Sequence, residues 1–369
     1  MRSRIAFFVV VIQSLLFTGH WLIYETWTHF WGALDPPYDI AVKATLVLLS
    51  VTFVTASLLS FRYSNVFARA YYKFAAAWLG TLNFLFLSAC ACWLIYGAAL
   101  LFGLHPDTRI LVLVFLVASL LASLCGMINA ASTRVRRISV KLENLPQAWQ
   151  GRTAALVSDV HLGHVRNVEF IRRIVRMVEG LKPDIVFITG DMYDGTKADL
   201  DGLADPWRLT APPLGKYFVL GNHEGFTDST RYLKAVARAG IRILDKEKVE
   251  LDGLQLVGVH YHDATHADHF RSVLARIGID RDRPSILLTH APDHVPVTAE
   301  AGISLQLSGH THSGQFFPFN LIVKRIYGPF AYGLSRLGNT QAYTTSGAGT
   351  WGPPLRVGTN PEIVLIRFE

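Results

Sequence analysis

The chain has 369 residues, of which 51% are hydrophobic and only 17% are charged, and its formal net charge is +7. An average globular chain carries about 25% charged residues, so this composition excludes an ordinary soluble protein, a disordered chain and a collagen-like repeat. The three cysteines are too few for a disulfide scaffold. What remains is a membrane protein, or a protein with a membrane part.

The first third of the chain contains four long stretches without Asp, Glu, Lys or Arg. They are Ile5–Tyr24, Ala44–Phe61, Phe74–Phe102 and Ile110–Thr133. A helix needs about 20 apolar residues to cross a hydrocarbon core of about 30 Å, and each stretch meets or approaches that length. We therefore expect a transmembrane region at 1–133 with four helices, at about 5–24, 40–61, 74–102 and 110–133.

Lys and Arg residues are distributed unevenly around these stretches. Most lie before the first, between the second and third, or just after the fourth, whereas only Lys43 and Arg109 lie on the other side. Because cytoplasmic loops carry the excess of Lys and Arg, the N-terminus and everything after the fourth helix are predicted to be cytoplasmic, in a multi-pass protein of the inner cell membrane. This placement explains the positive charge without a nucleic-acid partner. The stretches carry no charge that would mark an ion path, so we expect an anchor.

The remainder of the chain changes pattern. A basic linker is expected at 134–150 and a second domain at 151–369, where short apolar runs alternate with amphipathic ones as in α/β folds. Strands are predicted at Ala154–Val157, Ile185–Ile188, Tyr217–Leu220, Leu254–Val259, Ile286–Leu288, Leu305–Leu307, Ala342–Thr344 and Ile363–Ile366. Helices are predicted at Val168–Glu179, Thr230–Ala239 and Phe270–Ile277.

Five of the predicted strands are followed directly by Asp, Asn or His. These residues are Asp159 and His161, Asp191, Asn222 and His223, His290, and His310 and His312. Since the carboxyl ends of neighbouring strands meet in one crevice, we expect these side chains to converge. Carboxylate, amide and imidazole groups without thiolate suit Mn, Fe or Zn. Their number exceeds the needs of one tetrahedral ion, which predicts two divalent ions, about 3.5–4 Å apart, that clamp a phosphoryl group and activate water.

The ordered set resembles the signature of the calcineurin-like metallophosphoesterase superfamily, and in detail its membrane-anchored branch. The motifs that carry the resemblance are Asp159-x-His161, Gly190-Asp191, Gly221-Asn222-His223-Glu224, His290 and Gly309-His310-x-His312. The resemblance covers roughly residues 150–369 and leaves out the four apolar stretches. It implies a four-layer α/β/β/α sandwich, in which two sheets are flanked by helices.

The resemblance also implies roles for single residues. It implies that Asp159, His161 and His312 bind a first metal ion and that Asn222, His290 and His310 bind a second. Asp191 bridges the two ions. His223 stays off the metals and either protonates the leaving oxygen or steadies the transition state.

Several neighbouring residues allow more than one interpretation. Arg356 follows a Gly-rich turn, where it either clamps a phosphate or is an ordinary surface arginine. The histidines at 260, 262, 266 and 269 predict a solvated or substrate-facing loop. Asp194 and His164 are candidates to orient the metal ligands, and the alternative for His164 is an exposed side chain without a role in the site. The apolar residues from Phe316 to Val323 either pack in the core or face lipid beside the anchor.

Together these observations predict a membrane-anchored, dinuclear-metal-dependent phosphoesterase. The expected reaction is hydrolysis of a phosphodiester, pyrophosphate or phosphomonoester. The most specific prediction for the substrate is a lipid-linked or nucleotide-activated envelope precursor at the membrane surface. The alternative is a metal-binding interaction or regulatory module attached to a membrane domain, without hydrolase activity. The complete ligand set argues against that alternative. The oligomeric state stays open.

Overall fold

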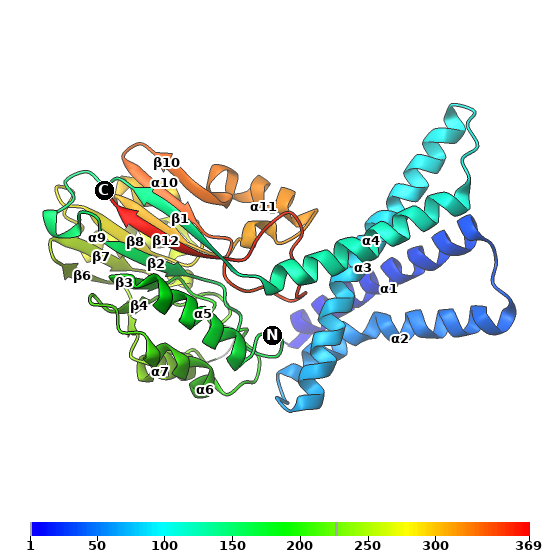
Figure 1. The fold of residues 1–369 in the computed structure, drawn as a ribbon, viewed down its shortest axis with the longest axis horizontal. Helices are drawn as coiled ribbons and strands as arrows, with labels where there is room; N and C mark the ends of the chain where they lie inside the picture. Colours follow the sequence, from blue (N-terminus) through cyan, green and yellow to red (C-terminus); the bar gives the residue numbers. More distant parts are fainter. Residues whose placement is uncertain (1, 226–227) are drawn as a thin grey trace. The chain divides into compact units, whose positions relative to one another are not determined.

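The computed structural model describes residues 2–225 and 228–369 (Figure 1). Contacts between residues divide the chain into two compact units. The first unit comprises Met1–Ile128 and Gly352–Leu355, and the second comprises Asn129–Trp351 and Arg356–Glu369. The division therefore falls in the last turn of a long helix and not at the predicted linker.

Long helices make up the first unit (Figure 1). They are α1 (Arg2–Trp31), α2 (Pro36–Ser60), α3 (Val66–Leu101) and α4 (Thr108–Ala131), the last turn of which belongs to the second unit. Two of the helix starts follow from the sequence. α2 begins with proline, whose fixed φ suits the first turn, and Asn65 caps α3 by accepting a hydrogen bond of 2.9 Å from the backbone N–H of Ala68.

Three of these helices, α2, α3 and α4, are long and apolar enough to cross a membrane, within the part of the chain that the structure describes. The prediction of four spans is thus corrected to three, because the segment expected at 5–24 lies in α1, which is not among them. α1 carries polar side chains that bond to its neighbours: Gln13 donates to the Ser50 carbonyl at 3.0 Å, and the His20 ring accepts from the Trp78 indole at 2.9 Å. The side chains of residues 2–6 and 8 lie outside the described residues.

Two mixed sheets form the centre of the second unit over the residues described. One sheet has the order β1 (Arg134–Val140), β12 (Glu362–Phe368), β2 (Thr153–Val157), β3 (Ile185–Ile188), β4 (Lys216–Phe218) and β5 (Arg242–Ile243). The other has the order β10 (Gly333–Leu337), β11 (Thr340–Thr344), β9 (Leu305–Ser308), β8 (Ser285–Leu288), β7 (Leu254–Gly258) and β6 (Glu247–Leu251). The strands from β2 to β5 run parallel in the first sheet, and so do those from β7 through β8 and β9 to β11 in the second.

Helices and short turns connect these strands (Figure 1). The helices are α5 (Val168–Leu181), α6 (Leu200–Ala204), α7 (Thr230–Arg238), α8 (Tyr261–Ala264), α9 (Ala267–Ile277), α10 (Val295–Glu300) and α11 (Phe319–Tyr327). The single turns of 3-10 helix are η1 (Gln147–Trp149), η2 (Asp205–Leu209), η3 (His312–Gly314) and η4 (Gly328–Ala331).

Adjacent residues of one strand enter different apolar clusters, because side chains alternate across a sheet. In β2, Leu156 belongs to a cluster shared by both sheets, whereas Val157 packs with α5 and α7. In β7, Leu256 belongs to the shared cluster and Val257 packs with α9. These clusters support the α/β/β/α order that the resemblance implies, and the four-layer sandwich itself stays a prediction.

The segment expected to be a basic linker contributes a strand to the first sheet. β1 pairs in parallel with β12, in a register that runs from Arg134 opposite Glu362 to Val140 opposite Phe368. Three arginines in this strand obscure the alternation of apolar and polar residues by which a strand is recognised in a sequence. Charged side chains are common on strands at the edge of a sheet. The second unit is thus built from β1 onward.

Candidate metal centre

Every site residue predicted from the sequence lies shortly after the end of a strand, and the strands come from both sheets. In the first sheet, Asp159 and His161 follow β2, Asp191 follows β3, and Asn222 and His223 follow β4. In the second sheet, His290 follows β8, and His310 and His312 follow β9. The parallel strands of the two sheets bring their carboxyl ends together, so that side chains far apart in the sequence meet.

The backbone of these loops has an unusual conformation. Positive φ angles occur at Asp159 (53°), His161 (51°), Asp191 (49°), His310 (69°) and His312 (49°). Residues other than glycine seldom adopt this left-handed region, and such strain is concentrated at functional sites, where surrounding contacts hold it. Here the His161 N–H donates to the Asp191 carbonyl at 3.0 Å, and the Asp159 N–H donates to the Gly190 carbonyl at 3.2 Å.

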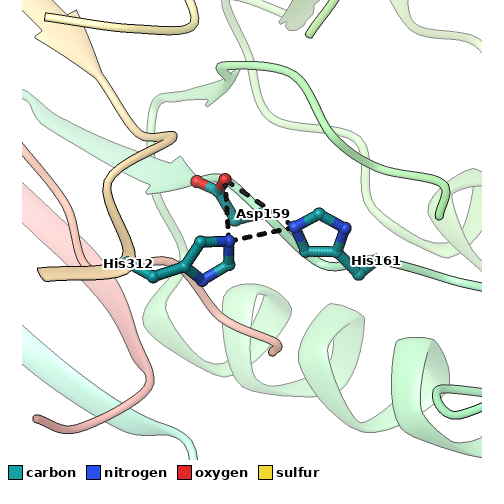
Figure 2. Close-up of side chains that lie close together, drawn as sticks. All are labelled: Asp159, His161 and His312. Carbon is teal, nitrogen blue, oxygen red and sulfur yellow. Dashed lines mark hydrogen bonds and ion pairs between the residues drawn. The ribbon is translucent and has the colours of Figure 1, made fainter. Parts of the chain in front are cut away.

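Asp159, His161 and His312 form the first group of candidate ligands (Figure 2). The Nε2 atoms of the two histidines lie 3.0 Å apart, and His312 Nε2 lies 3.4 Å from Asp159 Oδ1. His161 Nε2 lies 3.9 Å from the same carboxylate oxygen. All three side chains are buried. Three buried donor atoms therefore surround one position.

Asp191, His290 and His310 form a second group, and the amide of Asn222 lies against it. His290 Nε2 lies 3.2 Å from Asp191 Oδ2 and 3.1 Å from His310 Nδ1. Asn222 Oδ1 lies 2.9 Å from His290 Nε2 and 3.0 Å from His310 Nδ1. Two imidazoles, one carboxylate and one amide oxygen thus meet at this position.

Asp191 connects the two groups. Its Oδ2 atom is 3.2 Å from His290 Nε2 in the second group and 3.8 Å from His161 Nε2 in the first. Its other oxygen accepts a hydrogen bond of 2.9 Å from the backbone N–H of His223. One buried carboxylate therefore faces both positions.

His223 lies beside this carboxylate without joining the second group. Its Nδ1 donates to the Asp194 carbonyl at 3.1 Å, and its Nε2 is 3.9 Å from Asp191 Oδ2. Asp194 has a larger part in the site than the sequence indicated, because its carboxylate, His161 and His223 form a further group of potential ligands. His161 Nδ1 lies 3.5 Å from Asp194 Oδ1 without a hydrogen bond, so Asp194 is placed where a second-layer partner of a metal ligand lies.

Glu224 joins two ligand loops, a role that the sequence analysis missed. Its buried carboxylate accepts backbone hydrogen bonds from Asp191 (3.1 Å), Tyr193 (3.0 Å) and Gly221 (2.9 Å). Burial, together with the nearby Asp191 carboxylate, raises the pKa of Glu224 to about 7. The position of Glu224 directly after Asn222 and His223 was the available signal.

The two histidines of the second group differ in how readily they are protonated. Burial alone would lower the pKa of His290, but attraction to Asp191 outweighs it and raises that pKa to about 10. Burial, with repulsion from His290, lowers the pKa of His310 to about 3. The carboxylates therefore stabilise a cation at this depth.

The chemistry of the donor atoms fits divalent metal ions. The lone-pair atoms of His161 and His312 face each other and a carboxylate, and those of His290 and His310 face an amide oxygen. Mixed nitrogen and oxygen donors without sulfur are typical of sites for Mn, Fe or Zn. Asp191 lies between the two groups, so that each group could hold an ion.

Arg356 is neither a phosphate clamp nor a surface arginine, so both expectations for it are corrected. The side chain is completely buried, and it donates to the backbone carbonyls of Ser346 (2.6 Å), Gly349 (2.7 Å) and His312 (3.2 Å). Its guanidinium thus forms hydrogen bonds inside the protein, and burial lowers the pKa of Arg356 to about 10. An isolated arginine after a turn gives no sign of burial in the sequence.

The remaining histidines are placed differently from one another. His164 is buried and lies 3.1 Å from the Thr196 hydroxyl, so it is not exposed. His260 is also buried, and its Nδ1 accepts a hydrogen bond of 3.0 Å from the backbone N–H of Leu220 at the end of β4. None of His260, His262, His266 and His269 belongs to a potential metal group among the described residues.

Aromatic rings that the sequence analysis did not single out border the ligands. The Tyr261 ring lies 5.3 Å from the His310 ring, and the Tyr327 ring lies 6.3 Å from it. Trp351 lies 6.3 Å from His223 and is largely exposed. An apolar rim next to polar ligands is common in sites that bind organic substrates.

Comparisons with known proteins agree with this geometry. The family model for the calcineurin-like phosphoesterases matches residues 153–314. The chain is 33% identical to the transmembrane protein with metallophosphoesterase domain of Danio rerio, over 69% of this chain and 62% of that protein, which is less than two thirds of its length. It is 34% identical to an uncharacterized metallophosphoesterase of Aquifex aeolicus, over 64% of this chain and 92% of that protein.

A further relative is similar over nearly the whole chain. An uncharacterized metallophosphoesterase of Campylobacter jejuni is 29% identical over 88% of this chain and 89% of its own length. The matched family region contains both groups of candidate ligands. The chain therefore belongs to the calcineurin-like metallophosphoesterases, a family of enzymes that use divalent metal ions.

Proposed function

We propose that this chain is a membrane-anchored phosphoesterase that hydrolyses a phosphodiester, pyrophosphate or phosphomonoester with two divalent metal ions. The observation that carries the proposal is the pair of ligand groups that share Asp191, with its Oδ2 3.2 Å from His290 and 3.8 Å from His161. When bound, the ions supply the positive charge that polarises a phosphoryl group and activates water. Mn, Fe and Zn all suit these donors.

Each residue of the site has a defined task in this proposal. Asp159, His161 and His312 would hold one ion, and Asn222, His290 and His310 would hold the other. The carboxylate of Asp191 would serve both. His223, oriented by its hydrogen bond to the Asp194 carbonyl, gives a proton to the leaving oxygen or stabilises the negative charge of the transition state.

The catalytic unit lies on the cytoplasmic side of the inner membrane in this proposal. The change from four spans to three moves the N-terminus, with Arg2 and Arg4, to the opposite side, but most Lys and Arg residues stay on the side of the second unit. Arg62, Arg69 and Arg134 still lie on the same side as the second unit, whereas Lys43 and Arg109 lie opposite. Labelling of an engineered cysteine at exposed Asp268 in intact cells tests the orientation, and access from outside would overturn it.

A substrate at the membrane surface is supported by the path of the chain. Thr133 follows the candidate span α4 and donates to the Ala348 carbonyl at 3.2 Å. Ala348 and Gly349 in turn donate to the carbonyls of Ser158 and Asp159, both at 2.8 Å. Two hydrogen-bonded steps thus separate the end of a candidate span from a candidate metal ligand, which favours a lipid-linked phosphoester over a freely soluble one.

The function is tested by hydrolysis of bis(p-nitrophenyl) phosphate and p-nitrophenyl phosphate by the full chain in lipid nanodiscs. Release of nitrophenol should require Mn, stop with a chelator, and be lost in Asp191→Asn and strongly reduced in His223→Ala. The matched control is Asp201→Asn, because Asp201 is an exposed aspartate in α6. Wild-type activity in Asp191→Asn would overturn the proposal.

The alternative function, a metal-binding regulatory module, predicts a different result. In that case the full chain binds Mn in calorimetry but hydrolyses neither ester. The two reporters also separate the reaction types, since one is a diester and the other a monoester.

A further inference from the structure

The helix that follows the metal centre exposes its apolar side. In α11, Phe319, Ile322 and Ile326 recur at the helical spacing of three and four residues, and their exposed fractions are 45%, 49% and 66%. None of the described residues of α11 is buried. Of the apolar run from Phe316 to Val323, only Phe316 is classed as buried, so the expectation that this run packs in the core holds for that residue alone.

This exposure of the apolar side is the reverse of what is expected for a helix on the surface of a soluble domain. An amphipathic helix normally turns its apolar side to the core and its polar side to water. Here the polar residues Asn320, Lys324 and Arg325 lie on the opposite side of the helix, and the last two are exposed as well. Phe317 extends the exposed apolar surface. We call these four residues, Phe317, Phe319, Ile322 and Ile326, the α11 patch.

α11 is fixed beside the metal centre. At its start, the buried Phe316 packs edge-to-face on Phe319 with ring centroids 5.2 Å apart. At its end, the Tyr327 ring lies 6.3 Å from the ring of the candidate ligand His310. The helix therefore holds its exposed side at a set distance from the ligands.

Covalent connectivity places this region close to the end of a candidate span. Arg136 lies five residues after the last residue of α4, Ala131, so an extended chain allows at most about 18 Å between them. Arg136 donates to the Tyr332 hydroxyl at 2.6 Å, and only the turn η4 separates Tyr332 from the end of α11. α11 is thus tied to the residues at which the chain leaves the bilayer.

We propose that the α11 patch inserts into the interface of the membrane that anchors the chain, with Lys324 and Arg325 at the level of anionic lipid head groups. A helix with one apolar and one cationic side is the type that lies in the plane of a membrane surface. An exposed apolar patch marks an interaction site, and this patch belongs to a chain whose other unit carries candidate membrane spans.

Insertion has a consequence for the substrate, which rests on the function proposed above. The adjacent Tyr327 and His310 hold the candidate metal centre next to the inserted helix. A phosphoester at the head-group level, with its acyl chains still in the bilayer, then reaches the ligands without leaving the membrane. The substrate class is a phospholipid or a lipid-linked phosphoester.

Fluorescence quenching tests the insertion without reference to activity. Cys90, Cys92 and Cys125 are replaced by alanine, and an environment-sensitive fluorophore is placed by Ile326→Cys or, as the control, by Asp268→Cys in α9. The full chain is reconstituted in phosphatidylglycerol nanodiscs with phospholipids spin-labelled near the head group. Quenching at position 326, well above that at position 268, is expected. Equal quenching at both positions, or a shielded fluorophore that lipids do not quench because protein covers it, overturns the proposal.

Activity with two matched reporters tests the substrate. Ile322→Glu with Ile326→Glu is compared with the control Leu209→Glu, since Leu209 is an isolated exposed leucine in η2. Hydrolysis of phosphatidyl-p-nitrophenol embedded in the nanodisc should fall about tenfold to a hundredfold, as expected when two apolar side chains no longer insert into the membrane. Hydrolysis of soluble bis(p-nitrophenyl) phosphate should stay at the wild-type level.

The outcomes separate the two proposals. An equal loss on both reporters, or no loss on the lipid reporter, overturns lipid delivery by α11. If the wild-type chain cleaves neither reporter, the proposed hydrolase function fails, while quenching at position 326 still establishes insertion.

Discussion

The guanidinium of Arg356 is hydrogen-bonded to the backbone of His312, with Nη1 donating to the carbonyl at 3.2 Å, while Nη2 lies 3.1 Å from Nδ1 of the same ring. Nη2 also donates to Ser346 and Gly349, in the loop that follows β11. The same loop bonds to the backbone of Asp159 through the Gly349 N–H. Arg356 therefore holds two candidate ligands of one metal ion through a single loop, as a positioning residue.

Replacement of Arg356 by methionine should destabilise the chain and weaken metal binding. The change leaves several buried carbonyl groups without a donor, at a cost of about 1–3 kcal/mol each, so the thermal midpoint should fall by at least about 4–8 °C. Thermal unfolding of the full chain, followed by tryptophan fluorescence, measures the midpoint, and calorimetry measures the affinity for Mn. Arg336→Met, at an exposed arginine of β10, is the control. An unchanged midpoint in Arg356→Met would contradict the structural role.

Glu224→Gln should impair both metal groups. Its carboxylate accepts three backbone N–H groups, and the amide of glutamine would turn a donor toward at least one of them. The loops that carry Asp191 and Asn222 then lose their common support. We expect weaker binding of Mn and a fall in the thermal midpoint, whereas Glu179→Gln on the exposed side of α5 should leave both unchanged. Wild-type Mn affinity in Glu224→Gln would show that the carboxylate charge is dispensable.

Removal of metal should lower stability as well as activity. An ion that binds only the folded chain stabilises it by about 2.7 kcal/mol when present at a hundredfold excess over its Kd. A chelator should therefore lower the thermal midpoint, and added Mn should restore it. In Asp191→Asn this response should be largely lost, because that carboxylate faces both groups. A midpoint that ignores chelator and Mn in the wild-type chain would speak against a resident metal.

Gly309→Ala should abolish the site. A Cβ atom at this position would lie 2.0 Å from Ser158 Oγ and 2.2 Å from Asp159 Oδ2, closer than any van der Waals contact allows. The candidate ligand Asp159 must then move, so we expect loss of Mn binding and of hydrolysis. Gly180→Ala is the matched control, since a Cβ there meets no atom within 4 Å and alanine favours the helix by about 1 kcal/mol. Full activity in Gly309→Ala would refute the close approach.

The sequence was most informative where polar residues follow buried strands. The predicted strands are confirmed to within two residues at either end, from β2 at Thr153–Val157 to β12 at Glu362–Phe368. The apolar residues and the order of the motifs were enough to predict these strands. A buried parallel strand is a short apolar run, and here polar site residues follow its carboxyl end. The convergence of all eight predicted site residues followed from that pattern.

Features that depend on distant neighbours could not be predicted. The burial of Arg356 depends on carbonyls in a separate loop, and β1 pairs with a strand from the far end of the chain. α1 contains enough apolar residues to resemble a span, but Gln13 and His20 bond to neighbouring helices. The apolar run after His312 fitted either a core segment or an exposed helix, since periodicity alone does not reveal which side is covered.

The position of β12 between β1 and β2 has a consequence for how the protein is made. β1 follows directly after the candidate spans, whereas its partner strand β12 comes after all the other strands of both sheets along the chain. The first sheet therefore stays open between β1 and β2 until β12 has been synthesised, and the second unit cannot be completed before then. Loss of a few residues from β12 should be as damaging to biosynthesis as a substitution in the core, and a fragment that starts at Gly151 would lack β1 from the outset.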